Sequence, residues 1–262
     1  MKWLLWITIA IASAWAQQNS PGYAAYERAN ALFTKQQFAA SLDAVEEALR
    51  LDAALVPALT LRAKLAMAAK RNDLARADLE KAVSLNPKSA YAQFLLGLVL
   101  YEQNELQLAL KPFEAAMKGN ARDPRAPLYL GLCQESLGDT DQAAMLYEKA
   151  IRLEEQAGQP QVETYLIAAR LEMVLNRTDA AARWIDRAIR RDGSSRDARF
   201  ESARLAARRG NYTAAVKEAE RALALSGGET SETQIHALLA RSYQWLGDTA
   251  KASQHAGLAR GK

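Results

Sequence analysis

Small and apolar residues recur along this chain with a period of 34 residues. The clearest marker is an alanine late in each amphipathic stretch, at Ala48, Ala82, Ala116, Ala150, Ala188, Ala222 and Ala259. Four of the six intervals are 34 residues, and the two longer ones (38 and 37) coincide with stretches of loop composition at 155–160 and 226–230. A fixed period of this length is typical of stacked structural repeats, so the pattern predicts a repeat protein.

Two further series of small residues predict how each repeat folds. One stands seven residues before each marker alanine, which places both on the same helix face. Another stands nineteen residues before it, on a preceding helix, and Gly or Asn between the two predicts a helix-ending turn. The pattern therefore predicts pairs of crossing helices within units at about 22–55, 56–89, 90–123, 124–157, 162–195, 196–229 and 233–262.

The units resemble the tetratricopeptide repeat family. Leu96-Gly97 and Leu130-Gly131 match its Leu-Gly pair, Ala109…Phe113…Ala116 matches its small-aromatic element, and Pro87 matches its closing proline. The resemblance covers residues 22–262 and implies an all-α, right-handed α-solenoid of about seven helix-turn-helix repeats. It also implies that the first helix of each pair lines a concave groove that binds a protein or peptide.

The first sixteen residues have the order of a secretory signal. Lys2 precedes an uncharged run from Trp3 to Ala12, and Ala14 and Ala16 supply the small residues of a cleavage site. The alternative is a retained anchor, but the run is shorter than the roughly 20 residues that span a bilayer. We expect cleavage after Ala16, a short polar lead at 17–21, no integral membrane segment in the mature chain, and a periplasmic or secreted protein.

Composition excludes several other classes. Abundant alanine and few β-branched residues argue against a large sheet. One cysteine (Cys133) excludes an internal disulfide, and His236 and His255 alone make a poor metal site. Removing Lys2 lowers the formal net charge from +4 to +3, which argues against a nucleic-acid partner. We expect no cofactor, no metal and no enzymatic activity.

Two groups of side chains on the predicted first helices are candidates for the groove. Tyr91 and Tyr101 lie on one helical stripe with Phe94 and Leu98; the latter two are expected to be core, whereas each tyrosine fits packing and a wet groove equally. The second group is basic: Arg170, Arg204 and Arg241 occupy equivalent positions of the last three repeats, Lys64 has the same position in the second repeat, and Arg208 lies one turn beyond Arg204.

A row of guanidinium groups would bind an acidic partner through bidentate hydrogen bonds. The alternative is a solvated helix face, with Glu201 neutralising Arg204 from three residues away. We therefore expect an exported adaptor or assembly scaffold for a protein or peptide partner, which would be rich in carboxylates if the arginine row binds it. Self-association through the uncapped repeat at 233–262 is the first alternative, and an enzyme whose site is invisible in the sequence is the second.

Overall fold

The computed structural model describes residues 20–261, and the predicted signal at 1–16 lies outside them. The described residues form fourteen α-helices and no strand, which confirms the all-α prediction. Consecutive helices pack as hairpins, and the chain divides into two compact units at Arg122 and Asp123.

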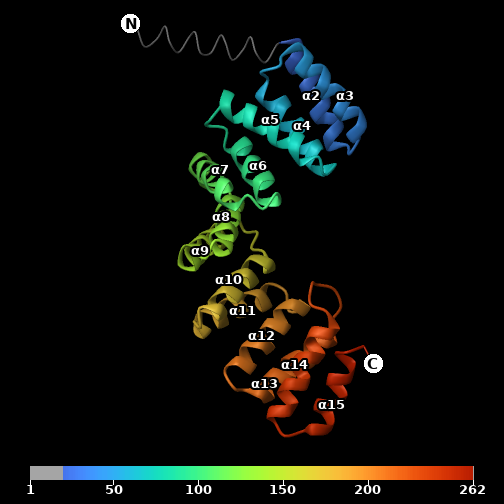
Figure 1. The fold of residues 1–262 in the computed structure, drawn as a ribbon, viewed down its shortest axis with the longest axis vertical. Coiled ribbons are helices and arrows are strands. Elements are labelled where there is room, and N and C mark those ends of the chain that lie inside the picture. The colour runs from blue at the N-terminus through green and yellow to red at the C-terminus, as the bar shows by residue number, and fades with distance from the viewer. Residues whose placement is uncertain (1–19, 262) are drawn as a thin grey trace. The chain divides into compact units, whose positions relative to one another are not determined.

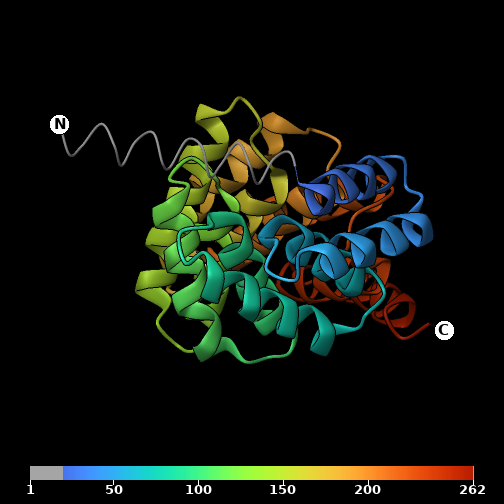
Figure 2. The same cartoon turned by 90° about the horizontal axis from the view of Figure 1, so that it is seen from above.

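The first unit contains three helical hairpins. In the first of them, drawn in blue, the two helices lie side by side in both views (Figure 1, Figure 2). The helices of this unit are α2 (Pro21–Thr34) with α3 (Phe38–Leu51), α4 (Val56–Ala68) with α5 (Asn72–Leu85), and α6 (Ala90–Glu102) with α7 (Leu106–Gly119).

The second unit contains four hairpins and ends with the C-terminal helix (Figure 1). Its helices are α8 (Arg125–Ser136) with α9 (Thr140–Gln156), α10 (Val162–Val174) with α11 (Thr178–Arg191), α12 (Arg196–Arg208) with α13 (Tyr212–Leu223), and α14 (Glu232–Trp245) with α15 (Thr249–Leu258). The first helices of the last three hairpins contact one another in the order α10, α12, α14.

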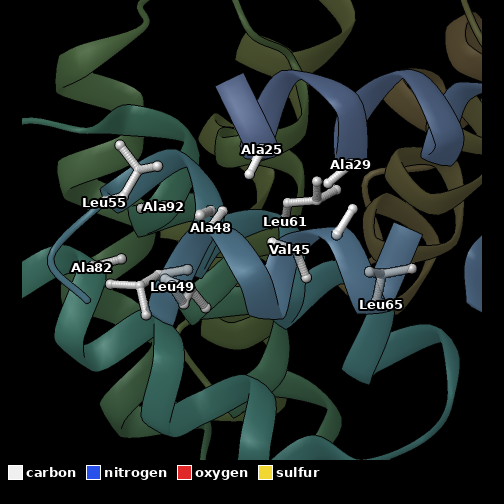
Figure 3. Packing of buried hydrophobic residues seen from close by; sticks show 13 residues of the cluster. Ala25, Ala29, Val45, Ala48, Leu49, Leu55, Leu61, Leu65, Ala82 and Ala92 are labelled. Atoms are coloured by element: carbon white, nitrogen blue, oxygen red, sulfur yellow. The ribbon is translucent and has the colours of Figure 1, made fainter. Parts of the chain in front are cut away.

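Small residues sit where the helices cross. In the first unit, Ala25 and Ala29 of α2 face Val45 and Ala48 of α3, and leucines from α4 fill the space beside them (Figure 3). A Cβ added to Gly97 on α6 would lie 2.7 Å from the Phe113 ring on α7, closer than real contacts allow. The repeated small residues therefore let two backbones approach closely while larger neighbours complete the core.

The last marker alanine departs from the pattern. Ala259 is the C-cap of α15 rather than a helical core residue, and it is half-buried, whereas Ala48 and Ala82 are completely buried. Helix α15 has no buried residue. The physical reason is that no hairpin within residues 20–261 covers the outer face of α15.

In each of the two long connections between hairpins, backbone amides donate hydrogen bonds to a carboxylate. Glu154 accepts hydrogen bonds from the Gln161 amide and the Thr164 hydroxyl, and burial raises its pKa despite them. Asp197 accepts from the amides of Glu229 and Thr230. Burial tends to raise the pKa of Asp197, but hydrogen bonding by the Thr230 side chain and the two amides, together with the charge of Arg170, holds the pKa below its ordinary value. The two insertions are thus ordered connections between hairpins.

Candidate binding grooves

The four arginines predicted for the groove lie together in one pocket of the second unit. Arg170 on α10, Arg204 and Arg208 on α12, and Arg241 on α14 all line a pocket of about 650 Å³. Three successive first helices supply its walls, because the hairpins stack with their equivalent faces aligned. The prediction that these residues form a peptide site is not tested by this placement, but the structure does bring them together.

Two rows of equivalent positions line this pocket, which we call the arginine groove. The first row is Arg170, Arg204 and Arg241. The second lies four residues further along each helix and consists of Val174, Arg208 and Trp245. Residues four apart share a helix face, so each helix presents one member of each row to the pocket.

A buried carboxylate lies beneath the first row. The Glu201 side chain is 2% exposed, and its Oε1 accepts a hydrogen bond of 2.7 Å from Arg170 Nε. Arg204 Nη1 donates to both oxygens of Glu201, at 3.0 and 2.9 Å. Burying a lone carboxylate is costly, so the two guanidinium groups are needed to compensate it.

One carboxylate does not neutralise four arginines. Arg208 donates only a long hydrogen bond, 3.5 Å, to the amide oxygen of Asn176. Arg241 is exposed and makes no ion pair within residues 20–261. The groove therefore keeps an excess of positive charge. The predicted neutralisation of Arg204 by Glu201 is present, but it does not extend to Arg208 and Arg241.

Aromatic and apolar side chains line the same groove, and the sequence reasoning missed them. The rings of Trp245 and Tyr212 stack with centroids 5.5 Å apart and planes 3° from parallel. Phe200 and Leu238 are buried among the lining residues. The available signal was positional: Trp245 stands four residues after Arg241, just as Arg208 stands four after Arg204.

The first unit has a pocket of different chemistry. It measures about 720 Å³ and is lined by Tyr23, Tyr26, Lys64 and Tyr91 among apolar side chains. The Lys64 ammonium lies 4.1 Å from the centroid of the Phe33 ring and 5.8 Å from that of Tyr91. Burial, and then neighbouring Tyr23, raises the pKa of Tyr26. Lys64 and Tyr91 thus meet in this tyrosine pocket of the first unit, whereas the four arginines line the pocket of the second unit.

The other predicted side chains are partly or wholly in the core. Phe94 is 5% exposed, as expected for a core residue, and Leu98 is half-buried. Tyr101 is half-buried on α6 and lines neither the tyrosine pocket nor the arginine groove. Cys133 is buried, and burial raises the pKa of its thiol to about 11.

The two histidines meet in the last hairpin. Their Nδ1 atoms are 3.0 Å apart, and the Tyr243 ring stacks on His255. Burial and the neighbouring His236 lower the pKa of His255. Within residues 20–261, no group of three or more His, Cys, Asp or Glu side chains is placed to hold a metal ion. Across the same residues, no helix has both the length and the apolar character that crossing a bilayer requires.

Comparisons of the sequence with known proteins agree on one family. A family model described as tetratricopeptide repeat matches residues 60–127 and 168–230, and a second model of that description matches residues 126–154. The TPR repeat-containing protein MJ0940 of Methanocaldococcus jannaschii is 35% identical over 77 residues, which are 29% of this chain. The matched stretch spans only 24% of that relative's length.

Two solved structures show the same fold. The structure of PilW, a widely conserved type IV pilus biogenesis factor, is 20% identical, with a TM-score of 0.67 over 79% of this chain and 94% of PilW. The structure of YrrB, a TPR protein with an unusual peptide-binding site, is also 20% identical, with a TM-score of 0.59 over 72% of this chain and 95% of YrrB. With its fourteen helices in hairpins and family models matching at least half of its length, this chain belongs to the tetratricopeptide repeat family.

Proposed function

We propose that this protein is an exported adaptor that binds an acidic segment of a partner protein in the arginine groove. The observation that carries the proposal is the convergence of four arginines from three helices on one pocket, where a single buried carboxylate, that of Glu201, pairs with two of them. Guanidinium groups recognise carboxylates through paired hydrogen bonds, so an excess of them in a groove favours an acidic ligand.

The relatives support a role in binding or assembly. Tetratricopeptide repeat proteins typically act as non-catalytic scaffolds. YrrB is described by its peptide-binding site and PilW by its part in pilus biogenesis. We take this chain to act in the same general way, as a scaffold without catalytic activity, in the periplasm or cell envelope.

Binding of an acidic peptide can be measured by fluorescence, because a tryptophan lines the groove. Trp245 lines the groove, and beyond residue 16 the only other tryptophan is Trp184. A short peptide of alternating Glu and Ala should change the tryptophan emission of residues 17–262, and the matching Lys-Ala peptide should not. Arg204→Ala and Arg241→Ala should each weaken binding about fivefold, the effect of losing about 1 kcal/mol.

Matched controls lie on the second helix of a neighbouring hairpin. Arg183 and Arg190 are on α11 and line neither the arginine groove nor the tyrosine pocket. Arg183→Ala and Arg190→Ala should leave the affinity unchanged. Equal losses from all four substitutions would show that the peptide responds to net charge, and would contradict a specific groove.

Export is tested separately by the mature N-terminus. Expressed in a bacterium with its full sequence, the protein should be recovered outside the cytoplasm, with mass spectrometry giving Gln17 as the first residue. Ala14→Lys and Ala16→Lys should block cleavage, because a small-residue site cannot accept a long charged side chain. Recovery in the cytoplasm with residues 1–16 still attached would contradict the export proposal.

A further inference from the structure

Among the described residues, the two most exposed large apolar side chains both line the arginine groove. Trp245 is 71% exposed and Val174 is 70% exposed, and both line the groove. Exposed apolar side chains gathered in one concave site indicate a surface that a ligand covers. The feature is independent of the arginines, since it concerns apolar area rather than charge.

The Trp245 indole stacks on Tyr212 and forms a platform in the groove. Tyr212 covers part of the indole by near-parallel stacking, and the exposed fraction shows that much of the ring remains accessible. A side chain that is already oriented loses little conformational freedom when a ligand packs on it. Aromatic ligand groups gain most from such a platform, because they stack on it with offset geometry.

The platform stands among cationic side chains. Arg241 precedes Trp245 by four residues on α14, and Arg208 occupies the position on α12 equivalent to Trp245. Both arginines retain charge that no carboxylate in the groove neutralises. A ligand ring placed on Trp245 would therefore share the groove with two guanidinium groups, one from α14 and one from α12.

We propose that the groove recognises an acidic protein segment that carries an aromatic side chain between carboxylates, with the ring packed on Trp245. This inference rests on the proposed function and specifies the partner's chemistry. The carboxylates on either side of the ring pair with Arg208 and Arg241, and Val174 adds apolar contact from α10.

Aromatic platforms with arginines also fit single-stranded nucleic acid. The groove favours a protein segment for two reasons. The groove is lined in part by the buried apolar side chains of Phe200 and Leu238, which suit the apolar side chains of a protein segment. The chain without residues 1–16 also has a formal net charge of only +3, unlike the strongly basic surfaces of nucleic-acid-binding proteins.

The test compares four probes by calorimetry with the chain of residues 17–262. Three are Glu-rich peptides of equal length and charge with Phe, Leu or Ala at the centre, and the fourth is oligothymidylate of equal charge. We expect the Phe peptide to bind about tenfold more tightly than the Ala peptide, with Leu between them. We also expect the oligothymidylate to bind more weakly than the Phe peptide.

Variants then assign the preference to the platform. Trp245→Ala should reduce the Phe-to-Ala affinity ratio to about one while acidic peptides still bind. Val174→Ser, at a position too exposed to affect folding, should reduce the ratio partly. Met145→Ala, which removes an exposed apolar side chain of α9 outside the groove, should leave the ratio unchanged.

Three results would overturn the inference, and they differ in what they say of the proposed function. Equal affinity of the Phe and Ala peptides removes the aromatic preference but leaves the acidic-segment proposal intact. Oligothymidylate binding as tightly as the Phe peptide assigns the platform to nucleic acid instead. Absence of binding by every acidic peptide overturns the proposed function, and the inference with it.

Discussion

Arg204 and Glu201, three residues apart on α12, form an ion pair at 2.9 Å in which the carboxylate is buried and the guanidinium is half-exposed. Arg170 of the preceding hairpin shares the same carboxylate. Glu201 therefore has two effects: it joins two hairpins, and it reduces the positive charge of the groove.

Glu201→Gln separates these effects. The substitution removes charge-assisted hydrogen bonds to Arg170 and Arg204 and should lower the free energy of unfolding by about 2 kcal/mol. The same substitution should tighten binding of an acidic peptide about fivefold, because one negative charge leaves the groove. Urea denaturation and calorimetry measure the two quantities. Glu218→Gln, which breaks surface pairs with Arg199 and Arg221, should leave the affinity unchanged.

Gly97→Ala tests the close helix crossing. Its Cβ would meet the Phe113 ring at 2.7 Å, so the hairpin must shift, at a cost of about 1–3 kcal/mol of stability. Adding Phe113→Leu should cost less than the two single changes together, since the smaller side chain makes room. Gly193→Ala is the control, because the nearest atom to its Cβ would be 3.8 Å away. Equal effects at Gly97 and Gly193 would contradict the crossing.

Lys70→Gly should stabilise the protein by about 0.5–1 kcal/mol. Lys70 ends α4 with φ of 57°, a left-handed conformation that costs a residue with a Cβ about 1–2 kcal/mol. Asn104 occupies the equivalent turn with φ of 60°, but asparagine adopts this conformation more readily. Asn104→Gly should therefore gain less. Thermal or urea denaturation measures both, and a larger gain at Asn104 would contradict the argument.

Acidification should loosen the last hairpin. Because the folded state lowers the pKa of His255, its neutral form is stabilising. That contribution is present above the ordinary histidine pKa of about 6.5 and is lost as the pH falls below it through the lowered value. The charged groups facing His255 are His236, Glu220 and Lys251. Hydrogen exchange of α15, corrected for intrinsic rates, should rise as the pH falls below about 6.5. In His255→Gln this pH dependence should shrink; an unchanged profile would exclude His255 as its source.

The sequence predicted the helical hairpins because their small crossing residues must recur wherever two helices pack closely. Turns that carry Gly or Asn, such as those at Gly138 and Asn104, could also be predicted, because these residues adopt a positive φ readily. The equivalent turns at Gln36 and Lys70 were not, because neither residue favours the positive φ that the structure gives it. In the second repeat, Asn72 is not part of the turn but begins α5.

The candidate site was predictable only in part. Equivalent positions of successive repeats must lie side by side, so Arg170, Arg204 and Arg241 could be grouped from spacing alone. Charge neutralisation and exposure depend on three-dimensional neighbours, which is why the sharing of Glu201 by two hairpins and the stacking of Trp245 on Tyr212 were not foreseen. Only Tyr91 lines the tyrosine pocket. The sequence could not distinguish it from Tyr101, because both residues lie on the same stripe of one helix.

The central claim is that the charge of the arginine groove selects an acidic partner segment. Exchanging that charge tests it most directly: Arg204→Glu with Arg241→Glu should abolish calorimetric binding of the Glu-Ala peptide and create binding of the Lys-Ala peptide. Arg183→Glu with Arg190→Glu on α11, an identical change in net charge, should preserve the original preference. If both double variants bind the two peptides alike, the arginine groove does not determine the partner, and the account is wrong.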